Sequence, residues 1–221
     1  MFDILHTPAR AAALGVLAGL ALMAAGCSKD PSSDQVTADD MSEGSADAKV
    51  TVIEYASVAC PICARVNQEL MPKFKAKYVD TKLVRYVYRP MLTGNPQVAA
   101  AGHMLANCVA KDKRFGVIDA IMRSQARMDE GGAPEQYVNA RPVLVGIAQS
   151  SGLSEDDFNK CITDSKGLEH MNDLAEQYHK LGVDATPTFF VNGKKMDLIK
   201  GDITDFDSAI QPELAKASAK K

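Results

Sequence analysis

The chain has 221 residues, of which 46% are hydrophobic and 24% are charged, and 25 Lys and Arg against 28 Asp and Glu give a formal net charge of −3. This balance, with no basic stripe along the chain, disfavours a nucleic-acid binder. The length is enough for one domain of ordinary size in addition to terminal segments.

The N-terminus has the pattern of a signal peptide, which we bound at residues 1–26. A short polar head containing Arg10 leads into an uncharged run of small and apolar residues that starts at Ala11. The run is short and rich in alanine and glycine, which favours a cleaved signal over an uncleaved membrane anchor. It ends in MAAGC, which resembles the lipobox of bacterial lipoproteins with Cys27 lipidated, although Ala24 stands where leucine is usual. We expect a lipid anchor there, with ordinary cleavage within the alanine stretch as the alternative.

Residues 27–48 are expected to form a disordered tether. After its first residue the segment is polar, acidic and nearly free of large apolar side chains. Such a composition cannot bury a core. The folded part is therefore expected to begin at Lys49.

Two segments of the first half have the composition of buried strands. Residues 49–57 and 82–90 are both rich in Val, Ile and Tyr, which favours strands. Between them a four-residue apolar spacing predicts a helix face, formed by Ile62, Val66, Leu70 and Phe74. Pro72 lies inside this helix and should kink it. The order strand, helix, strand predicts a right-handed parallel unit.

The middle of the chain, residues 93–182, is predicted to be helical. Helical apolar spacing runs through four stretches, residues 95–115, 116–128, 135–152 and 165–182. The third is expected to kink at Pro142. A further short helix begins with a near capping box, Ser154 to Asp157, and Gly182 ends the last one.

The C-terminal part is predicted to be a hairpin followed by a helix. Residues 186–199 suit two strands joined by a type I′ turn at Asn192–Gly193, and residues 204–217 suit a closing helix. The whole order predicts an α/β fold, in which a mixed sheet is covered by helices. Residues 49–92 and 183–221 would form the sheet domain, and residues 93–182 an all-helical insertion.

The cysteine count points to two pairs. The chain has five cysteines, Cys27, Cys60, Cys63, Cys108 and Cys161. If the first is lipidated or lies at the cleavage site, four remain. In an exported chain these are expected to form disulfides, because the compartment is oxidising.

Cys60 and Cys63 enclose Pro61 and Ile62 at the predicted start of a helix. A zinc site would need four ligands, and the remaining cysteines and histidines supply no second closely spaced pair, so no metal or cofactor is expected. A disulfide between the two cysteines closes too small a loop to stabilise the fold. A helix N-terminus instead favours the thiolate of Cys60, and Cys63, one turn later, can resolve a mixed disulfide. The pair is interpreted as a redox-active dithiol.

Glu54 lies six positions before Cys60, in a strand that should be buried. Burial raises the pKa of a carboxyl group, which could then exchange the proton that moves with Cys63. The alternative is an ordinary glutamate at an exposed edge of the sheet.

The stretch VTVIEYASVACPICARV, the helical block and GVDATPTFFVNGKK together resemble the DsbA family of thioredoxin-fold thiol:disulfide oxidoreductases. The resemblance runs from Lys49 to the C-terminus and implies a thioredoxin-like fold with an inserted helical domain. It implies that Cys60 is the attacking thiol, Cys63 the resolving thiol and Glu54 a buried acid.

The same resemblance assigns residues around the pair. It implies a cis Thr186–Pro187 bond that leaves the backbone of Thr186 free to pair with an extended substrate, next to Pro61 and Ile62. It also suggests a structural disulfide between Cys108 and Cys161, the alternative being two separately buried thiols. The implied partners are protein thiol substrates and a DsbB-like membrane oxidase, for a monomer in the bacterial periplasm that is lipid-anchored to a membrane.

One position departs from the family's strongly oxidising members. They carry histidine where this chain has Ile62, which offers no hydrogen-bond donor to the thiolate. We therefore expect a weaker oxidant, still most consistent with an oxidase because the tether is too short and polar to be the dimerisation module of isomerases. The alternatives are a reductase or isomerase kept reduced by a membrane electron carrier, and a non-catalytic thioredoxin-like or copper-binding protein.

Overall fold

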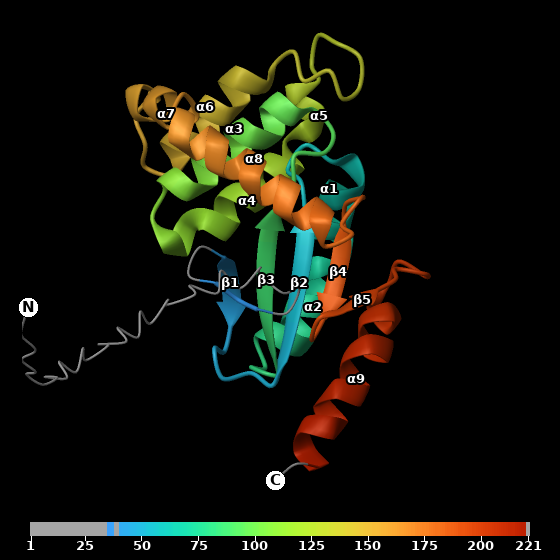
Figure 1. Cartoon of the computed structure of the whole chain (residues 1–221). Helices are drawn as coiled ribbons and strands as arrows, with labels where there is room; N and C mark the ends of the chain where they lie inside the picture. Colours follow the sequence, from blue (N-terminus) through green and yellow to red (C-terminus); the bar gives the residue numbers. More distant parts are fainter. Residues whose placement is uncertain (1–34, 38–39, 220–221) are drawn as a thin grey trace, which may run out of the picture. The chain divides into compact units, whose positions relative to one another are not determined.

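One mixed sheet organises the computed structural model, which describes residues 35–37 and 40–219 (Figure 1). Its strands in these residues are β1 (Met41–Gly44), β2 (Val50–Ala56), β3 (Val84–Pro90), β4 (Thr188–Val191) and β5 (Lys194–Met196). They lie in the order β1-β3-β2-β4-β5. The central strands β2 and β3 are parallel, and all other neighbours are antiparallel. The mixed sheet that the sequence predicts is therefore confirmed.

The chain between β2 and β3 is helical but broken. It comprises α1 (Pro61–Glu69), α2 (Met71–Phe74) and a π-helical segment, Lys75–Val79. Pro72 lies in the first turn of α2, where its missing N–H removes no helical hydrogen bond. The kink expected at this proline is therefore a complete break between two helices.

Helices also fill the chain between β3 and β4. They are α3 (Pro96–Cys108), a 3-10 turn (Lys111–Lys113), α4 (Arg114–Arg123), α5 (Gln125–Met128), α6 (Ala140–Ser150), α7 (Glu155–Ile162) and α8 (Ser165–Lys180). The predicted cap of α7 is confirmed, because the Ser154 hydroxyl oxygen accepts the amide hydrogen of Asp157 at 3.1 Å. The helix α9 (Ile203–Ala219) follows β5.

The prediction of a proline-kinked helix from residue 135 is wrong. The helix α6 begins at Ala140, so Pro142 lies in its first turn. The preceding segment folds around Asp129, whose carboxylate accepts the amide hydrogens of Glu135 and Tyr137 at 2.9 Å each. These two residues have φ values of 65° and 53°, which a right-handed helix does not allow.

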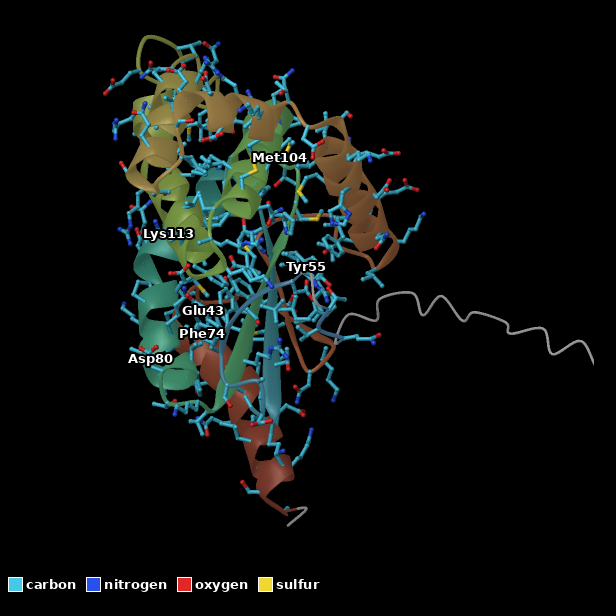
Figure 2. The ribbon with its side chains drawn as sticks, turned by 90° about the vertical axis from the view of Figure 1, so that its left-hand side faces the viewer. Glu43, Tyr55, Phe74, Asp80, Met104 and Lys113 are labelled. Carbon is cyan, nitrogen blue, oxygen red and sulfur yellow. A yellow bond between two sulfur atoms is a disulfide. The ribbon has the colours of Figure 1, made fainter. Side chains whose placement is uncertain are left out.

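The two faces of the sheet pack against different helices. Phe74 belongs to the cluster that joins one face to α1, α2, α4 and α9, whereas Tyr55 belongs to the cluster on the other face, with Tyr178 of α8. Figure 2 shows Phe74 and Tyr55 on opposite sides of the strands. The hairpin after β4 turns at Asn192 and Gly193, both with positive φ, as a type I′ turn requires.

The described end of the predicted tether is ordered, so the expectation of disorder up to Ala48 is wrong. The strand β1 pairs with the edge of β3, from Met41 opposite Tyr88 to Gly44 opposite Arg85. Composition alone misses this, because it does not show that β3 has a free edge that a short polar strand can cover.

A buried ion pair fixes the same segment. The Arg89 guanidinium donates to the Asp40 carboxylate at 2.9 and 3.0 Å, and also to the Tyr55 hydroxyl and the Gln35 carbonyl. The side chains of Arg89 and Asp40 are 1% and 5% exposed. Burial opposes the charge of Arg89, but the bonds to Asp40 and Tyr55 outweigh it and raise the arginine pKa further above its ordinary value.

The predicted signal peptide and the proposed lipidation site Cys27 lie outside the described residues. Within the described part of the chain, none of the helices combines the length and the apolar character that a membrane crossing requires.

Candidate active site

Cys60 lies at the N-terminus of α1, where the loop after β2 turns into the helix. Its backbone is extended, with φ −95° and ψ 119°, and its sulfur accepts the amide hydrogen of Cys63 at 3.3 Å. Pro61 is the first helical residue, a position that needs no N–H. The sulfur therefore caps the helix and meets its unpaired amide groups.

The two sulfurs are free thiols with opposite electrostatic character. The pKa of Cys60 is lowered to about 6, mainly by the hydrogen bond from the Cys63 thiol. Burial of the Cys60 sulfur opposes this shift, whereas contacts to Thr186 and to backbone amides lower the pKa further. Burial first, and then the neighbouring Cys60, raise the pKa of Cys63 far above its ordinary range. Cys60 is thus a thiolate at neutral pH, whereas Cys63 remains a thiol.

Alkylation should report this difference directly. We expect the iodoacetamide reactivity of the reduced protein to rise with pH around a midpoint near 6, because only the thiolate of Cys60 reacts. The modified residue is identified by mass spectrometry, with Cys60→Ser as the control that should remove the acidic midpoint. A midpoint near ~8.5, as for an ordinary thiol, would contradict the assignment.

The loop before β4 brings a carbonyl to the nucleophile. In its protonated form the Cys60 thiol donates to the Thr186 carbonyl at 3.5 Å, and the Thr186–Pro187 peptide bond is cis. The Thr186 hydroxyl is hydrogen-bonded to that of Thr93, in the loop after β3. Two loops that are distant in sequence therefore hold this backbone beside the sulfur.

Ile62 is the apolar neighbour of the pair on the surface. Its side chain is 53% exposed, and Pro61 before it is also exposed. An exposed aliphatic side chain gives the rim next to Cys60 an apolar contact area, but no donor for the thiolate.

Glu54 lies on β2 and is 2% exposed, so the alternative of an exposed edge residue is wrong. Its carboxylate accepts a short hydrogen bond from the Tyr86 hydroxyl of β3. Burial raises the pKa of Glu54 to about 7 and outweighs the bond from Tyr86 and the charge of Lys75, while the charge of Cys60 adds to the rise. The carboxyl group is thus able to exchange a proton near neutral pH.

The helical region supplies contacts that the sequence analysis missed. The Gln125 side-chain amide donates to the carbonyls of Val58 and Cys60 at 2.8 and 3.2 Å, and the Tyr137 hydroxyl donates to the carbonyl of Ala59 at 3.0 Å. The loop that carries the nucleophile is therefore held by side chains 65 to 78 residues further along the chain. Local sequence holds no signal for this, since Gln125 lies in an ordinary amphipathic pattern.

Replacing Gln125 by methionine should destabilise the fold through this loop. The change keeps the length of the side chain but leaves two buried carbonyls without their donor, a loss that costs ~1–3 kcal/mol in free energy of unfolding. Urea unfolding measures it, and Gln149→Met, at an exposed glutamine of α6, should change the stability by less than ~0.5 kcal/mol. Equal effects of the two substitutions would contradict the assigned contact.

A disulfide joins Cys108 at the end of α3 to Cys161 in α7, with the Cα atoms 6.3 Å apart. The bond closes a separation of 53 residues. It links two helices of the region between β3 and β4 and leaves Cys60 and Cys63 as the free thiols of the described chain.

Comparison with known proteins agrees with a thioredoxin-like sheet that carries a cysteine pair and an inserted helical region. A family model described as thioredoxin matches residues 36–211. A relative from Rickettsia bellii, named "Putative protein-disulfide oxidoreductase", is 31% identical over 72% of this chain and 59% of its own length. A relative of the same description from Rickettsia conorii is 30% identical over 83% of this chain and 65% of its own length. The chain therefore spans about three fifths of these relatives. The crystal structure of Wolbachia pipientis α-DsbA1 is similar at a TM-score of 0.70, with 28% identity over 84% of this chain and 96% of that one.

Proposed function

We propose that this chain, which belongs to the thioredoxin family, is a protein-disulfide oxidase. Its fold has the DsbA-like form, in which helices are inserted between β3 and β4. It would introduce disulfides into proteins outside the cytoplasm. The observation that carries the proposal is the pairing of a thiolate-forming Cys60 at a helix N-terminus with a buried, protonated Cys63.

The proposed reaction transfers a disulfide in two exchange steps. A substrate thiolate attacks the Cys60 sulfur of the oxidised pair, the Cys60–Cys63 bond breaks, and Cys63 leaves and takes up a proton. A second substrate thiolate then attacks the substrate sulfur of the mixed disulfide and releases Cys60 as a thiolate. Two electrons pass from the substrate to the pair, and the low pKa of Cys60 favours the release. A DsbB-like membrane oxidase would restore the disulfide.

The rim around Cys60 suits an extended protein substrate. The Thr186 backbone lies within 3.5 Å of the sulfur, and Ile62 is exposed beside it. We propose that a substrate strand pairs with Thr186, next to Pro187, while its side chains contact Pro61 and Ile62.

The direction of the reaction depends on how strongly the thiolate is stabilised. A Cys60 pKa of about 6 falls between the ~7 of thioredoxin and the ~3.5 of strongly oxidising DsbA proteins. Ile62 adds no donor that would lower it further. We therefore expect a reduction potential between those of these two classes.

Equilibration with glutathione buffers tests the direction. A potential less negative than about −200 mV, toward the ~−120 mV of strong oxidants, supports the oxidase. A more negative value, toward the ~−270 mV of thioredoxin, contradicts it and favours a reductase or isomerase kept reduced by a membrane electron carrier.

The proposed location is the periplasm, with a lipid at Cys27 holding the protein to a membrane. The support is the leader-like sequence that ends in MAAGC. An envelope fraction that resists high salt and yields to detergent would support the anchor, whereas release as a free protein would contradict it.

A further inference from the structure

The carboxyl group of Glu54 contacts the phenol of Tyr86 and lies close enough to Cys60 for the charge of that thiolate to act on it. Glu54 and Tyr86 are 2% and 3% exposed, and the Tyr86 hydroxyl donates to the carboxylate. The register of the parallel strands places Glu54 opposite Tyr88 and Val52 opposite Tyr86, so Glu54, Tyr86 and Tyr88 share one face of the sheet. Any proton that enters or leaves the carboxyl group must pass through this tightly packed surrounding.

A hollow of about 310 Å³ reaches Tyr86 from the surface. Tyr86 and Tyr88 line it on the sheet side, and its rim includes exposed residues such as Pro72 and Arg123. Glu43 of β1 also belongs to its wall. The hollow therefore connects solvent with the residue that touches Glu54.

The hollow also contains an unused acceptor. The side-chain oxygen of Asn67 is buried and has no hydrogen-bond partner among the described residues, and Asn67 lines the same hollow. A polar space of this size holds water when it offers hydrogen-bonding groups. The Asn67 oxygen is one such group, and Tyr86, which bonds to Glu54, lines the same hollow.

We propose that Tyr86 passes protons between the Glu54 carboxyl group and water in this hollow, and so supplies the proton that the departing Cys63 takes up. The inference rests on the proposed function and extends it to a residue outside the cysteine motif. It assigns Tyr86 a role as a proton-relay residue that acts through Glu54.

The step balances without any change in oxidation state. Glu54 gives its proton to the Cys63 sulfur, the resulting carboxylate takes the hydroxyl proton of Tyr86, and the Tyr86 oxygen takes a proton from water. The net result is one proton moved from solvent to Cys63. Burial and the neighbouring Glu54 raise the pKa of Tyr86 well above its ordinary value, so the two transfers at the phenol occur together and no free phenolate forms.

The charged groups around this route are defined. Glu54 is influenced by Tyr86, Lys75 and Cys60, and Tyr86 by Glu54, Tyr88 and Glu43. Around the hollow, Lys75 is paired with Glu43 at 2.6 Å, and Arg123 with Asp119 at 2.8 Å. On this route, burial raises the pKa of Glu54 to about 7, so its carboxyl group can gain or lose a proton near neutral pH.

Tyr86→Phe removes the hydroxyl group and keeps the ring. Tyr88→Phe is the matched control, because Tyr88 lies two residues further on the same strand and lines the same hollow, but its hydroxyl donates to the Ala56 carbonyl. Carbon-13 NMR of labelled glutamate carboxyl groups should give a higher Glu54 pKa in Tyr86→Phe, where a bond that lowers it is lost, and the wild-type value in the control.

The relay itself is tested by the rate at which dithiothreitol reduces the oxidised pair between pH 5 and 9. The chain has no tryptophan, so acid quenching with mass detection follows the reaction. Above the Glu54 pKa measured for each protein, Tyr86→Phe should be slower by roughly tenfold or more, less than the ~10²–10⁴-fold effect of a general acid or base itself, because Glu54 is retained. Below that pKa, Glu54 already carries its proton and the rates should agree.

Asn67→Leu tests the relay independently of Tyr86. It replaces the unpaired acceptor that would hold water in the hollow, and it leaves Tyr86 unchanged. It should slow reduction in the same pH range.

Profiles of Tyr86→Phe and Asn67→Leu that match wild type, or an equal loss in Tyr88→Phe, overturn the relay. If wild type itself fails to transfer its disulfide to a thiol peptide, the proposed function falls; if wild type transfers it and the profiles coincide, the relay alone falls.

Discussion

Replacing Cys60 by serine is expected to reduce disulfide transfer to the uncatalysed background, a loss of roughly 10³-fold or more, as for other removed nucleophiles. The reason is that Cys60 is the thiol whose pKa is lowered, to about 6, while Cys63 is fully buried and its pKa is raised. Transfer to a reduced peptide, followed by mass spectrometry, measures the effect.

Cys63→Ala should produce the opposite behaviour, a trap. In this variant the Cys60 thiolate attacks the disulfide of an oxidised peptide pair, whose S–S bond breaks and releases one peptide as a thiolate. The Cys60–peptide disulfide then persists, because Cys63 is no longer present to attack Cys60 and displace the peptide. Adducts should therefore accumulate on non-reducing gels and disappear with reductant, and Cys60→Ser should show none. If Cys63→Ala forms no adduct with disulfide-bonded peptides, a non-catalytic binding protein becomes the better interpretation.

Replacing Arg89 by methionine should cause the largest loss of stability. The substitution leaves the Asp40 carboxylate buried without its partner and also removes donors from Tyr55 and the Gln35 carbonyl. Breaking a buried ion pair in this way costs ~3–5 kcal/mol in free energy of unfolding. Urea unfolding with a two-state fit measures it.

Two variants make this prediction specific. Arg141 forms an ion pair with Glu155 in which both side chains are more than half exposed, so Arg141→Met should cost at most ~1 kcal/mol. The double variant Asp40→Leu with Arg89→Met replaces both charges and should be less destabilised than Arg89→Met alone. A double variant as unstable as the single one would show that packing, and not the unpaired charge, causes the loss.

The ordered segment around Asp40 has a consequence for the proposed anchor. If Cys27 carries a lipid, the segment that follows it is already held to β3 at Gln35 and again at Asp40, since Arg89 donates to both. The fixed point lies at the C-terminal end of β3, the end of the sheet at which β2 leads into Cys60.

Much of the fold was accessible from the sequence because it depends on neighbouring residues. The strands around Glu54 and Tyr86 follow from runs of β-branched and aromatic residues, and the turn at Asn192–Gly193 follows from a positive φ at both positions. The start of α1 is equally local, since a proline in the first turn and a capping sulfur depend on a few consecutive residues. Where a local rule failed, at Pro142, the side chain of Asp129 had set the backbone instead.

The chemistry of the site was decided by contacts between distant residues. The cysteine motif indicates a dithiol by itself, but the partner of Glu54 lies 32 residues away, the donor to the Cys60 carbonyl 65 residues away, and the ion pair that orders the N-terminal segment spans 49. Spacing and composition determine which backbone conformation a segment prefers and whether it can be buried. Which buried polar group meets which depends on how the strands and helices pack, and that packing sets the pKa values on which the reaction depends.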